Sequence, residues 1–259
     1  MYQHLLYEEI GRVAKATLNR PESYNALNKV LKAEIIDVFR NTQKNPNLSC
    51  LVLTGAGDKA FCSGQDLKES MVLHSPEDAE KWVRSFDDLY AAIRDFEKPY
   101  IASVNGVSAG SGFQLPLLAD IRICSDNAKF AMTEIDVGFA CIIGTTLMWD
   151  IFGRAKTTEL ILRGNFVSPQ EALDYGLVCK VVPFADLEKE TMALAQELAE
   201  KAPVSLKNNK KWFRALTEEK FKACMEFAIQ AHIEGYQAGE PNEYQKRFFE
   251  VRSRRRPEK

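Results

Sequence analysis

The 259-residue chain lacks an apolar run of the roughly 20 residues that a membrane-spanning helix requires. Its first nine residues are too short and too acidic for a secretory signal, so we expect a cytoplasmic protein without a membrane partner. An excess of one charge is also lacking, because 34 basic and 36 acidic residues leave a net charge of −2. This balance gives no reason to expect nucleic acid as the main ligand.

Cysteine pairs and metal-ligand spacings are lacking too. The six cysteines are scattered, with no Cys-x-x-Cys pair and no histidine at metal-ligand spacing. We therefore expect buried free thiols, which behave as small hydrophobic side chains, and no metal site. The sequence contains no internal repeat, and its length suits one large domain or a domain with a C-terminal appendage.

Short apolar runs alternate with helical patterns along the first part of the chain. Residues 4–10 and 12–19 read as a hairpin around Gly11, and Asn28 can cap a helix over Lys29–Lys44. Continuous apolar runs predict strands buried on both faces at residues 50–54, 100–105 and 121–124, and helical patterns cover residues 77–96 and 112–119. This alternation predicts an α/β core with parallel strands, followed by helices from residue 184 onward.

Two glycine-containing segments with polar residues follow predicted buried strands, at residues 59–68 and 105–115. Loops at the carboxyl ends of strands are where open α/β sheets bind ligands, and glycine lets the backbone approach a ligand closely. One backbone N–H from each segment can form a two-donor oxyanion hole. Tight packing alone is the alternative explanation of these glycines.

A third segment places Glu134 among apolar residues. A carboxyl group in apolar surroundings has a raised pKa, which suits a general acid or base. An exposed or ion-paired glutamate is the alternative.

Four sequence blocks, between about Val13 and Ala202, resemble the crotonase (enoyl-CoA hydratase/isomerase) superfamily and occur in its order. They are LNRPESYNALN, VLTGAGDKAFCSGQDLKE, KPYIASVNGVSAGSGFQLPLLADIRICSDNAKFAMTEIDVG and GLVCKVVP. The resemblance implies an α/β fold with a crotonase-like spiral of ββα turns over residues 1–190. It also implies a C-terminal helical trimerisation region over residues 191–259, and assembly as a homotrimer or a dimer of trimers.

The resemblance also implies the ligand and the residues that bind it. The substrate is an acyl-CoA thioester, so coenzyme A arrives with the substrate and no cofactor is bound permanently. The two oxyanion donors fall on the backbone N–H groups of Gln65 and Ser111. Residues at positions that contact CoA are Tyr24, Ala26, Ala60, Asp66, Leu67 and Lys68. For Lys68 a solvent-facing charge is an equal alternative.

Two departures from the family pattern change the expected chemistry. The second catalytic glutamate is kept as Glu134, but the first is replaced by Gln114, whose amide has no proton to transfer. Gln114 is therefore expected to orient substrate or water, and a two-glutamate hydratase mechanism is disfavoured. The usual proline-glycine turn is replaced by residues 140–143, so Cys141 is expected to contact substrate in a more apolar pocket, without acting as a nucleophile.

The leading activity is double-bond isomerisation or hydration of an enoyl-CoA, and isomerisation better matches a single glutamate. The alternatives are hydratase-lyase chemistry, C–C bond formation of the carboxymethylproline synthase type, and a non-catalytic acyl-CoA binder. His4, His74 and His232 lie far from the motif blocks and are expected to be surface or satisfied histidines, with an acid or base role, as in some relatives, as the alternative for His74 and His232. The C-terminal aromatic residues are expected to pack helices and subunits, and the basic run at residues 252–259 to be solvated.

Overall fold

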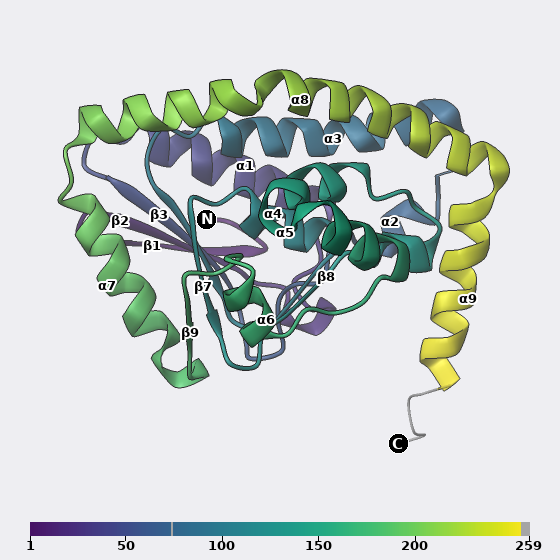
Figure 1. Cartoon of the computed structure of the whole chain (residues 1–259), viewed down its shortest axis with the longest axis horizontal. Helices are drawn as coiled ribbons and strands as arrows, with labels where there is room; N and C mark the ends of the chain where they lie inside the picture. The colour runs from purple at the N-terminus through teal and green to yellow at the C-terminus, as the bar shows by residue number, and fades with distance from the viewer. Residues whose placement is uncertain (74, 255–259) are drawn as a thin grey trace.

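The computed structural model describes residues 1–73 and 75–254 and confirms an α/β core (Figure 1). Six strands form a large sheet in the order β1-β2-β3-β5-β7-β9. The strands are β1 (Leu5–Ile10), β2 (Val13–Leu18), β3 (Cys50–Gly55), β5 (Tyr100–Val104), β7 (Ile121–Ser125) and β9 (Lys180–Val182). The predicted hairpin is the antiparallel pair β1–β2, with Leu5 opposite Leu18, and every other pair in this sheet is parallel.

Strand β3 shows why the apolar runs are continuous. Leu51 and Leu53 face the cluster that includes Ile35 of α1, whereas Cys50 and Val52 face Ala195 of α7. Helices therefore cover both faces of the sheet, and no position along β3 remains for a solvent-facing polar side chain.

A second, three-stranded sheet was not predicted. It consists of the parallel strands β4 (Ala60–Cys62), β6 (Val107–Ala109) and β8 (Lys129–Ala131), in that order. Successive ββα turns place one strand in the large sheet and the next in the small one, which confirms the expected spiral. The two predicted oxyanion segments thus contain β4 and β6, and the predicted donors Gln65 and Ser111 come after these short strands.

Side-chain caps define the best-predicted helices. The Asn28 side chain accepts a hydrogen bond from the N–H of Leu31 (2.8 Å), and α1 covers Lys29–Lys44 as predicted. Ser75 caps α3 (Pro76–Arg94) in the same way. The remaining elements of this region are η1 (Pro21–Ser23), α2 (Leu67–Ser70), α4 (Ser111–Leu117), η2 (Glu134–Val137), α5 (Ile142–Arg163), α6 (Pro169–Asp174) and η3 (Phe184–Asp186).

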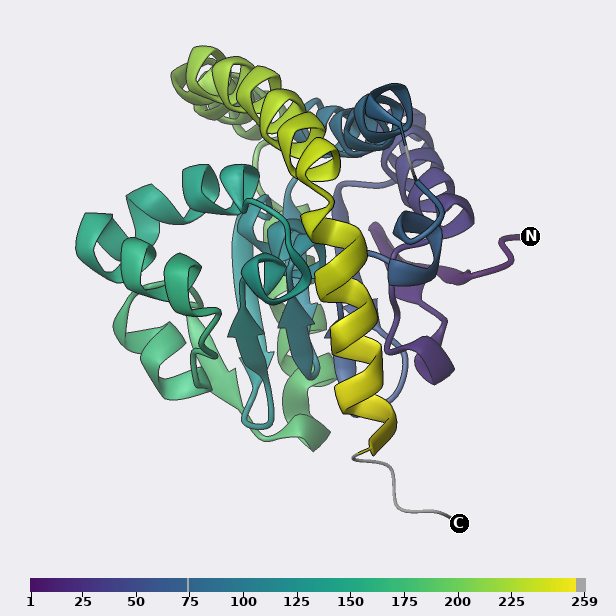
Figure 2. The same cartoon turned by 90° about the vertical axis from the view of Figure 1, so that its right-hand side faces the viewer.

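Three helices complete the chain: α7 (Leu187–Ala199), α8 (Pro203–Ala238) and α9 (Glu240–Arg254). The boundary expected between residues 190 and 191 falls inside α7, which packs on the large sheet and so belongs to the core. Helix α8 runs along α3 and α5, and the chain then turns sharply at Gly239 so that α9 leaves the end of α8 and packs against η2 (Figures 1 and 2). This turn brings Phe248 and Phe249 of α9 to the cavity that the segments after β4, β6 and β8 line.

All six cysteines are free thiols; five are buried, as predicted, and Cys179 is exposed. Among the helices within the described residues, none is both long enough and apolar enough to cross a bilayer.

Candidate functional site

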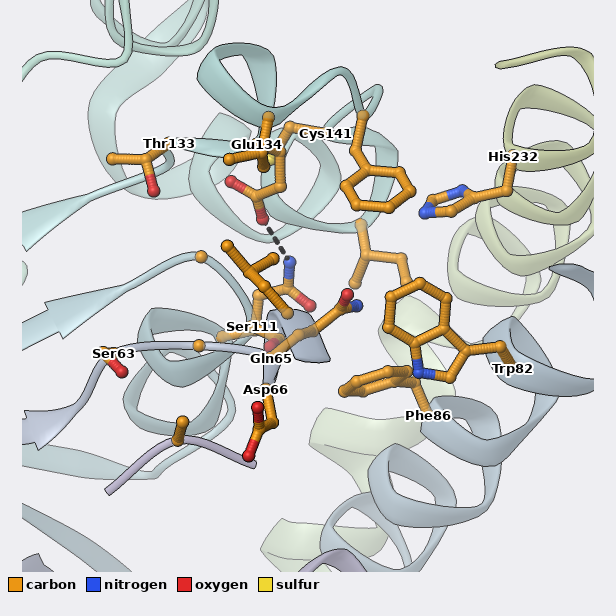
Figure 3. A pocket seen from close by; sticks show the side chains of 18 of the residues that line it. Ser63, Gln65, Asp66, Trp82, Phe86, Ser111, Thr133, Glu134, Cys141 and His232 are labelled. Atoms are coloured by element: carbon orange, nitrogen blue, oxygen red, sulfur yellow. Dashed lines mark hydrogen bonds between the residues drawn. The ribbon is translucent and has the colours of Figure 1, made fainter. Parts of the chain in front are cut away.

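A cavity of about 580 Å³ lies where the segments after β4, β6 and β8 meet α3, α8 and α9 (Figure 3). It brings together ten of the eleven side chains or backbones that the sequence singled out. These are Tyr24, Ala26, Gln65, Asp66, Leu67, Lys68, Ser111, Gln114, Glu134 and Cys141.

Two of the residues predicted to contact CoA, Ala60 and Asp66, have polar groups that are already hydrogen-bonded to neighbouring loops. Ala60 lies within β4, is 2% exposed, and is outside the set of described residues that line the cavity. Its carbonyl accepts a hydrogen bond from the Asn25 side chain (2.8 Å). Asp66 lines the cavity, but its carboxylate pairs with Arg20 (3.0 Å) and accepts from the N–H of Lys68 (3.2 Å). Both residues therefore help to fix the conformation of the loops that carry Arg20, Asn25 and Lys68.

The N–H groups of Gln65 and Ser111 make no hydrogen bond within the described part of the chain. Their neighbours do: the N–H of Asp66 donates to the carbonyl of Leu27 (3.0 Å), and the N–H of Gly110 donates to a carbonyl of β8 (2.9 Å). Buried backbone donors are nearly always paired, so two adjacent unpaired donors beside a cavity indicate a site for a ligand oxygen.

Glycines allow the two donor loops to touch. Gly64 has a φ of +100°, and a Cβ there would lie 2.8 Å from the carbonyl oxygen of Ala109 and 3.6 Å from the nitrogen of Ser111. A Cβ at Gly112 would lie 2.3 Å from the carbonyl oxygen of Cys62. Any side chain at either position would push the loops apart, so the glycines fix the spacing of the donors.

Glu134 begins η2 and directs its carboxyl group into the cavity. Its Oε1 accepts a hydrogen bond from Nε2 of Gln114 (3.2 Å). Its Oε2 is buried and accepts no hydrogen bond from a described residue. Burial raises the pKa of Glu134 to about 7, although its own backbone N–H, Cys141 and Gln114 act in the opposite direction. The Glu134 carboxyl group forms no ion pair with any described residue, so among these residues the structure does not support the alternative of an ion-paired glutamate.

Gln114 is held at both ends of its amide. The hydroxyl of Tyr90 donates to Oε1 of Gln114, and Nε2 of Gln114 donates to Glu134, so the orientation of the amide is fixed. Both Gln114 and Tyr90 are buried. Sequence reasoning missed Tyr90 because it lies on α3, outside the motif blocks, and reaches Gln114 only after α3 packs over α4.

We expect Tyr90→Phe to lower kcat by about 5- to 10-fold, which corresponds to the loss of one hydrogen bond of about 1 kcal/mol. Without the hydroxyl, the Gln114 amide is free to rotate, and its hydrogen bond to Glu134 weakens. That bond lowers the pKa of Glu134, so the midpoint of the pH–rate profile should move upward. Rates measured between pH 5 and 9 check both effects.

Tyr100→Phe is the matched control. Tyr100 is also fully buried, and its hydroxyl donates to the carbonyl of Leu115 (3.3 Å) away from the cavity. An unchanged pH midpoint in Tyr90→Phe, or an equal shift in the control, would contradict a positioning role.

Cys141 lies at the N-terminus of α5 and is 7% exposed. Burial and the neighbouring Glu134 carboxylate raise the pKa of its thiol well above the usual range. The thiol therefore stays protonated near neutral pH and lacks the thiolate that a nucleophile requires. A Cβ at Gly144 would lie 2.4 Å from Sγ of Cys141, so the thiol can take this position only because residue 144 has no side chain.

The far wall of the cavity is aromatic and was not predicted. It contains Trp82, Phe86, Phe139, His232, Phe248 and Phe249. His232, expected to be a surface or satisfied histidine, has its ring in the lining of the cavity, and its Nδ1 bonds the carbonyl of Ala228. Phe248 and Phe249, expected to pack helices or subunits, reach the cavity because the chain turns at Gly239. His74 and residues 255–259 of the basic run lie outside the described residues.

Within residues 1–73 and 75–254, no group of three or more His, Cys, Asp or Glu side chains is placed to hold a metal ion. The cavity instead sets two backbone donors opposite one protonatable carboxyl group. Such a site can polarise a carbonyl group and transfer a proton to or from a nearby carbon.

Comparison with known proteins identifies the family. Residues 8–255 match the family model described as enoyl-CoA hydratase/isomerase. The chain is 35% identical to (E)-benzylidenesuccinyl-CoA hydratase of Thauera aromatica, over 78% of this chain and 79% of that protein. It is 36% identical to carnitinyl-CoA dehydratase of Escherichia coli, over 80% and 79% respectively.

A solved enoyl-CoA hydratase/isomerase from Pseudoalteromonas atlantica superposes with a TM-score of 0.87 and 29% identity, over 99% of this chain and all of that one. The family model covers nearly the whole chain, and the two relatives share more than a third of the aligned residues. The chain therefore belongs to the enoyl-CoA hydratase/isomerase (crotonase) family and is an enzyme of it.

Proposed function

We propose that this enzyme moves a proton on an enoyl-CoA thioester, with Glu134 as its only proton-transferring carboxylate and double-bond migration as its reaction. The observation that carries this proposal is the chain of hydrogen bonds from Tyr90 through Gln114 to Glu134. These hydrogen bonds fix an amide at the position where a two-glutamate hydratase mechanism needs a second carboxylate. They also leave Oε2 of Glu134 without a hydrogen-bond partner beside the cavity.

The thioester oxygen accepts hydrogen bonds from the N–H groups of Gln65 and Ser111, which stabilise the enolate as charge moves onto that oxygen. Oε2 of Glu134 takes a proton from C-2 of a 3-enoyl-CoA and returns it to C-4, so the double bond moves into conjugation with the thioester. A carboxyl pKa of about 7 suits both transfers near neutral pH. The CoA moiety extends past Tyr24 and Lys68 at the cavity mouth.

Hydration of a 2-enoyl-CoA is the second candidate. The relatives named a hydratase and a dehydratase, at 35% and 36% identity, favour it. A water molecule can donate to Oε2 of Glu134 while accepting from the second hydrogen of the Gln114 amide. Glu134 then takes the water proton as oxygen adds to C-3 and returns that proton to C-2.

Isotope labelling separates the two reactions. The purified protein is incubated with 3-enoyl-CoA or 2-enoyl-CoA in D₂O that contains H₂¹⁸O, and the products are analysed by NMR and mass spectrometry. Migration is identified by NMR from the new position of the double bond and adds no ¹⁸O, and deuterium enters at C-4 only where the Glu134 proton exchanges with solvent before it is returned. Hydration incorporates both isotopes. Aldehyde release or decarboxylation would indicate lyase or C–C bond-forming chemistry. Binding without migration or hydration of either substrate would contradict the proposed proton transfer and favour a non-catalytic acyl-CoA binder.

The proposed homotrimer, or dimer of trimers, is supported by the surface of α8. Four large apolar side chains on its N-terminal half are each more than half exposed: Val204, Trp212, Phe213 and Leu216. An isolated chain would leave this apolar surface in water, and association of the C-terminal helical region would bury it.

A further inference from the structure

The aromatic end of the cavity is a distinct chamber, which we define by Trp82 and Phe86 of α3, Phe139 after η2, and His232 of α8. The rings contact one another: Trp82 meets Phe139 edge-on at 5.6 Å, and the Phe139 and His232 rings stack at 5.3 Å with an interplanar angle of 23°. Figure 3 shows Trp82, Phe86 and His232 on the side of Glu134 opposite Ser63. With the thioester carbonyl at the N–H groups of Gln65 and Ser111, as proposed above, an acyl chain that passes Glu134 can extend into this chamber.

His232 contributes the polar atom whose role the proposed function leaves open. Its Nδ1 lies 2.8 Å from the carbonyl oxygen of Ala228, and since a carbonyl can only accept, Nδ1 carries the hydrogen. Burial lowers the pKa of His232 below its usual value of 6.5, so the ring is neutral at pH 7. Nε2 then holds a lone pair, has no hydrogen-bond donor among the described residues, and points into the cavity in Figure 3.

The aromatic chamber has no charge of its own. The charged side chains that line the cavity are Glu22, Asp66, Lys68 and Glu134, none of which belongs to the aromatic chamber. A carboxylate or ammonium group on the acyl end would lose its hydration there without finding an ionic partner. A flat, uncharged ring instead meets other rings in edge-on or offset contacts, which stabilise aromatic pairs beyond simple burial.

From these contacts we propose that the acyl group ends in an uncharged aromatic ring bearing a hydroxyl group, which packs in the aromatic chamber and donates a hydrogen bond to Nε2 of His232. The inference rests on the proposed function only in that an acyl-CoA occupies this cavity. Because Nε2 can only accept, a ligand group that bonds to it must be a donor, and a plain hydrocarbon packed against it would leave that lone pair unsatisfied.

Binding of saturated acyl-CoAs, which contain no double bond to migrate or hydrate, tests the inference. Calorimetry compares 3-(4-hydroxyphenyl)propionyl-CoA with its phenyl and 4-carboxyphenyl analogues and with a straight-chain acyl-CoA of equal carbon number. We expect the hydroxyphenyl ligand to bind about 3- to 10-fold more tightly than the phenyl ligand, and the carboxyphenyl ligand at least about 10-fold more weakly. The phenyl ligand should exceed the straight chain by about 2- to 10-fold.

His232→Phe keeps a ring against Phe139 but removes Nε2, and it should reduce the hydroxyphenyl preference to about one. His232→Gln returns a hydrogen-bond acceptor and should restore part of the preference, which separates loss of the acceptor from loss of packing. His4→Phe makes the same replacement outside the cavity and should leave every ratio unchanged. Equal affinities for the two ligands in the wild type, or a preference that survives His232→Phe, would overturn the inference.

The two proposals fail separately. Conversion of an enoyl-CoA that depends on Glu134, together with no preference for the ring or its hydroxyl group, would reject the aromatic acyl group and leave the proposed function standing. Selective binding of the hydroxyphenyl ligand with no conversion of any enoyl-CoA would do the reverse.

Discussion

Replacing Glu134 with glutamine is expected to lower turnover by at least about 100-fold while acyl-CoA binding survives, because a positioned acid or base contributes about that much. The glutamine side chain fills the same space and still accepts a hydrogen bond from Gln114, but it carries no transferable proton. In the wild type, kcat/KM should fall as the pH drops below about 7, because the protonated carboxyl group cannot remove a proton. The variant's residual rate should lack this dependence.

The same substitution is expected to stabilise the protein at alkaline pH. The native state binds the Glu134 proton more tightly than the unfolded chain, with a pKa of about 7 against 4.5, so wild-type stability falls as the pH rises through that window. The full cost is at most about 3 kcal/mol, and we expect about 1–2 kcal/mol because Glu134 lines the cavity and is only partly buried as a residue. Urea unfolding at pH 4.5 and pH 8 measures the difference.

Glu197→Gln, on the surface of α7, is the control for both measurements, and we expect it to change neither turnover nor the pH dependence of unfolding. Turnover of Glu134→Gln within a few-fold of wild type would remove Glu134 from the mechanism. A stability difference between Glu134→Gln and wild type that is the same at both pH values would show that the carboxyl group is not destabilised by burial.

The elements predicted correctly are those whose signals are local. Helix α1 has both its cap, Asn28, and its apolar face within one segment, and the buried runs of β3 and β5 are long enough to stand out. Strands β4, β6 and β8 have three residues each, which is too short for a periodic pattern. The family resemblance, and not periodicity, implied the spiral that these strands complete.

The candidate site divides in the same way. Gln65, Ser111 and Glu134 lie within motif blocks, so the sequence alone is enough to align their positions with the family pattern. Tyr90 and His232 lie on long helices without motifs, and they reach the site only because α3 and α8 pack over it. Contacts between distant segments depend on the assembled core, and a single sequence does not record them.

The largest expected effect on the proposed oxyanion hole comes from Gly64→Ala. The added Cβ would lie 2.8 Å from the carbonyl oxygen of Ala109, and the residue has a φ of +100°, which an L side chain rarely adopts. The loop must move, and the N–H of Gln65 moves with it. Loss of one such donor costs about 100- to 1000-fold in kcat, and KM should change less because the donor acts mainly on the charge that develops in the transition state.

Gly176→Ala separates this effect from backbone strain alone. Gly176 also has a positive φ, of +72°, but a Cβ there meets no atom within 4 Å, and the residue lies outside the cavity lining. Thermal unfolding should therefore show a loss of stability in both variants, larger for Gly64→Ala because of the added clash, and steady-state kinetics should show a loss of kcat only for Gly64→Ala. If Gly64→Ala folds and retains kcat within about threefold, a backbone donor at Gln65 does not stabilise the transition state. In that case only the N–H of Ser111 would remain of the two proposed donors, and the proposal of a two-donor oxyanion hole would be rejected.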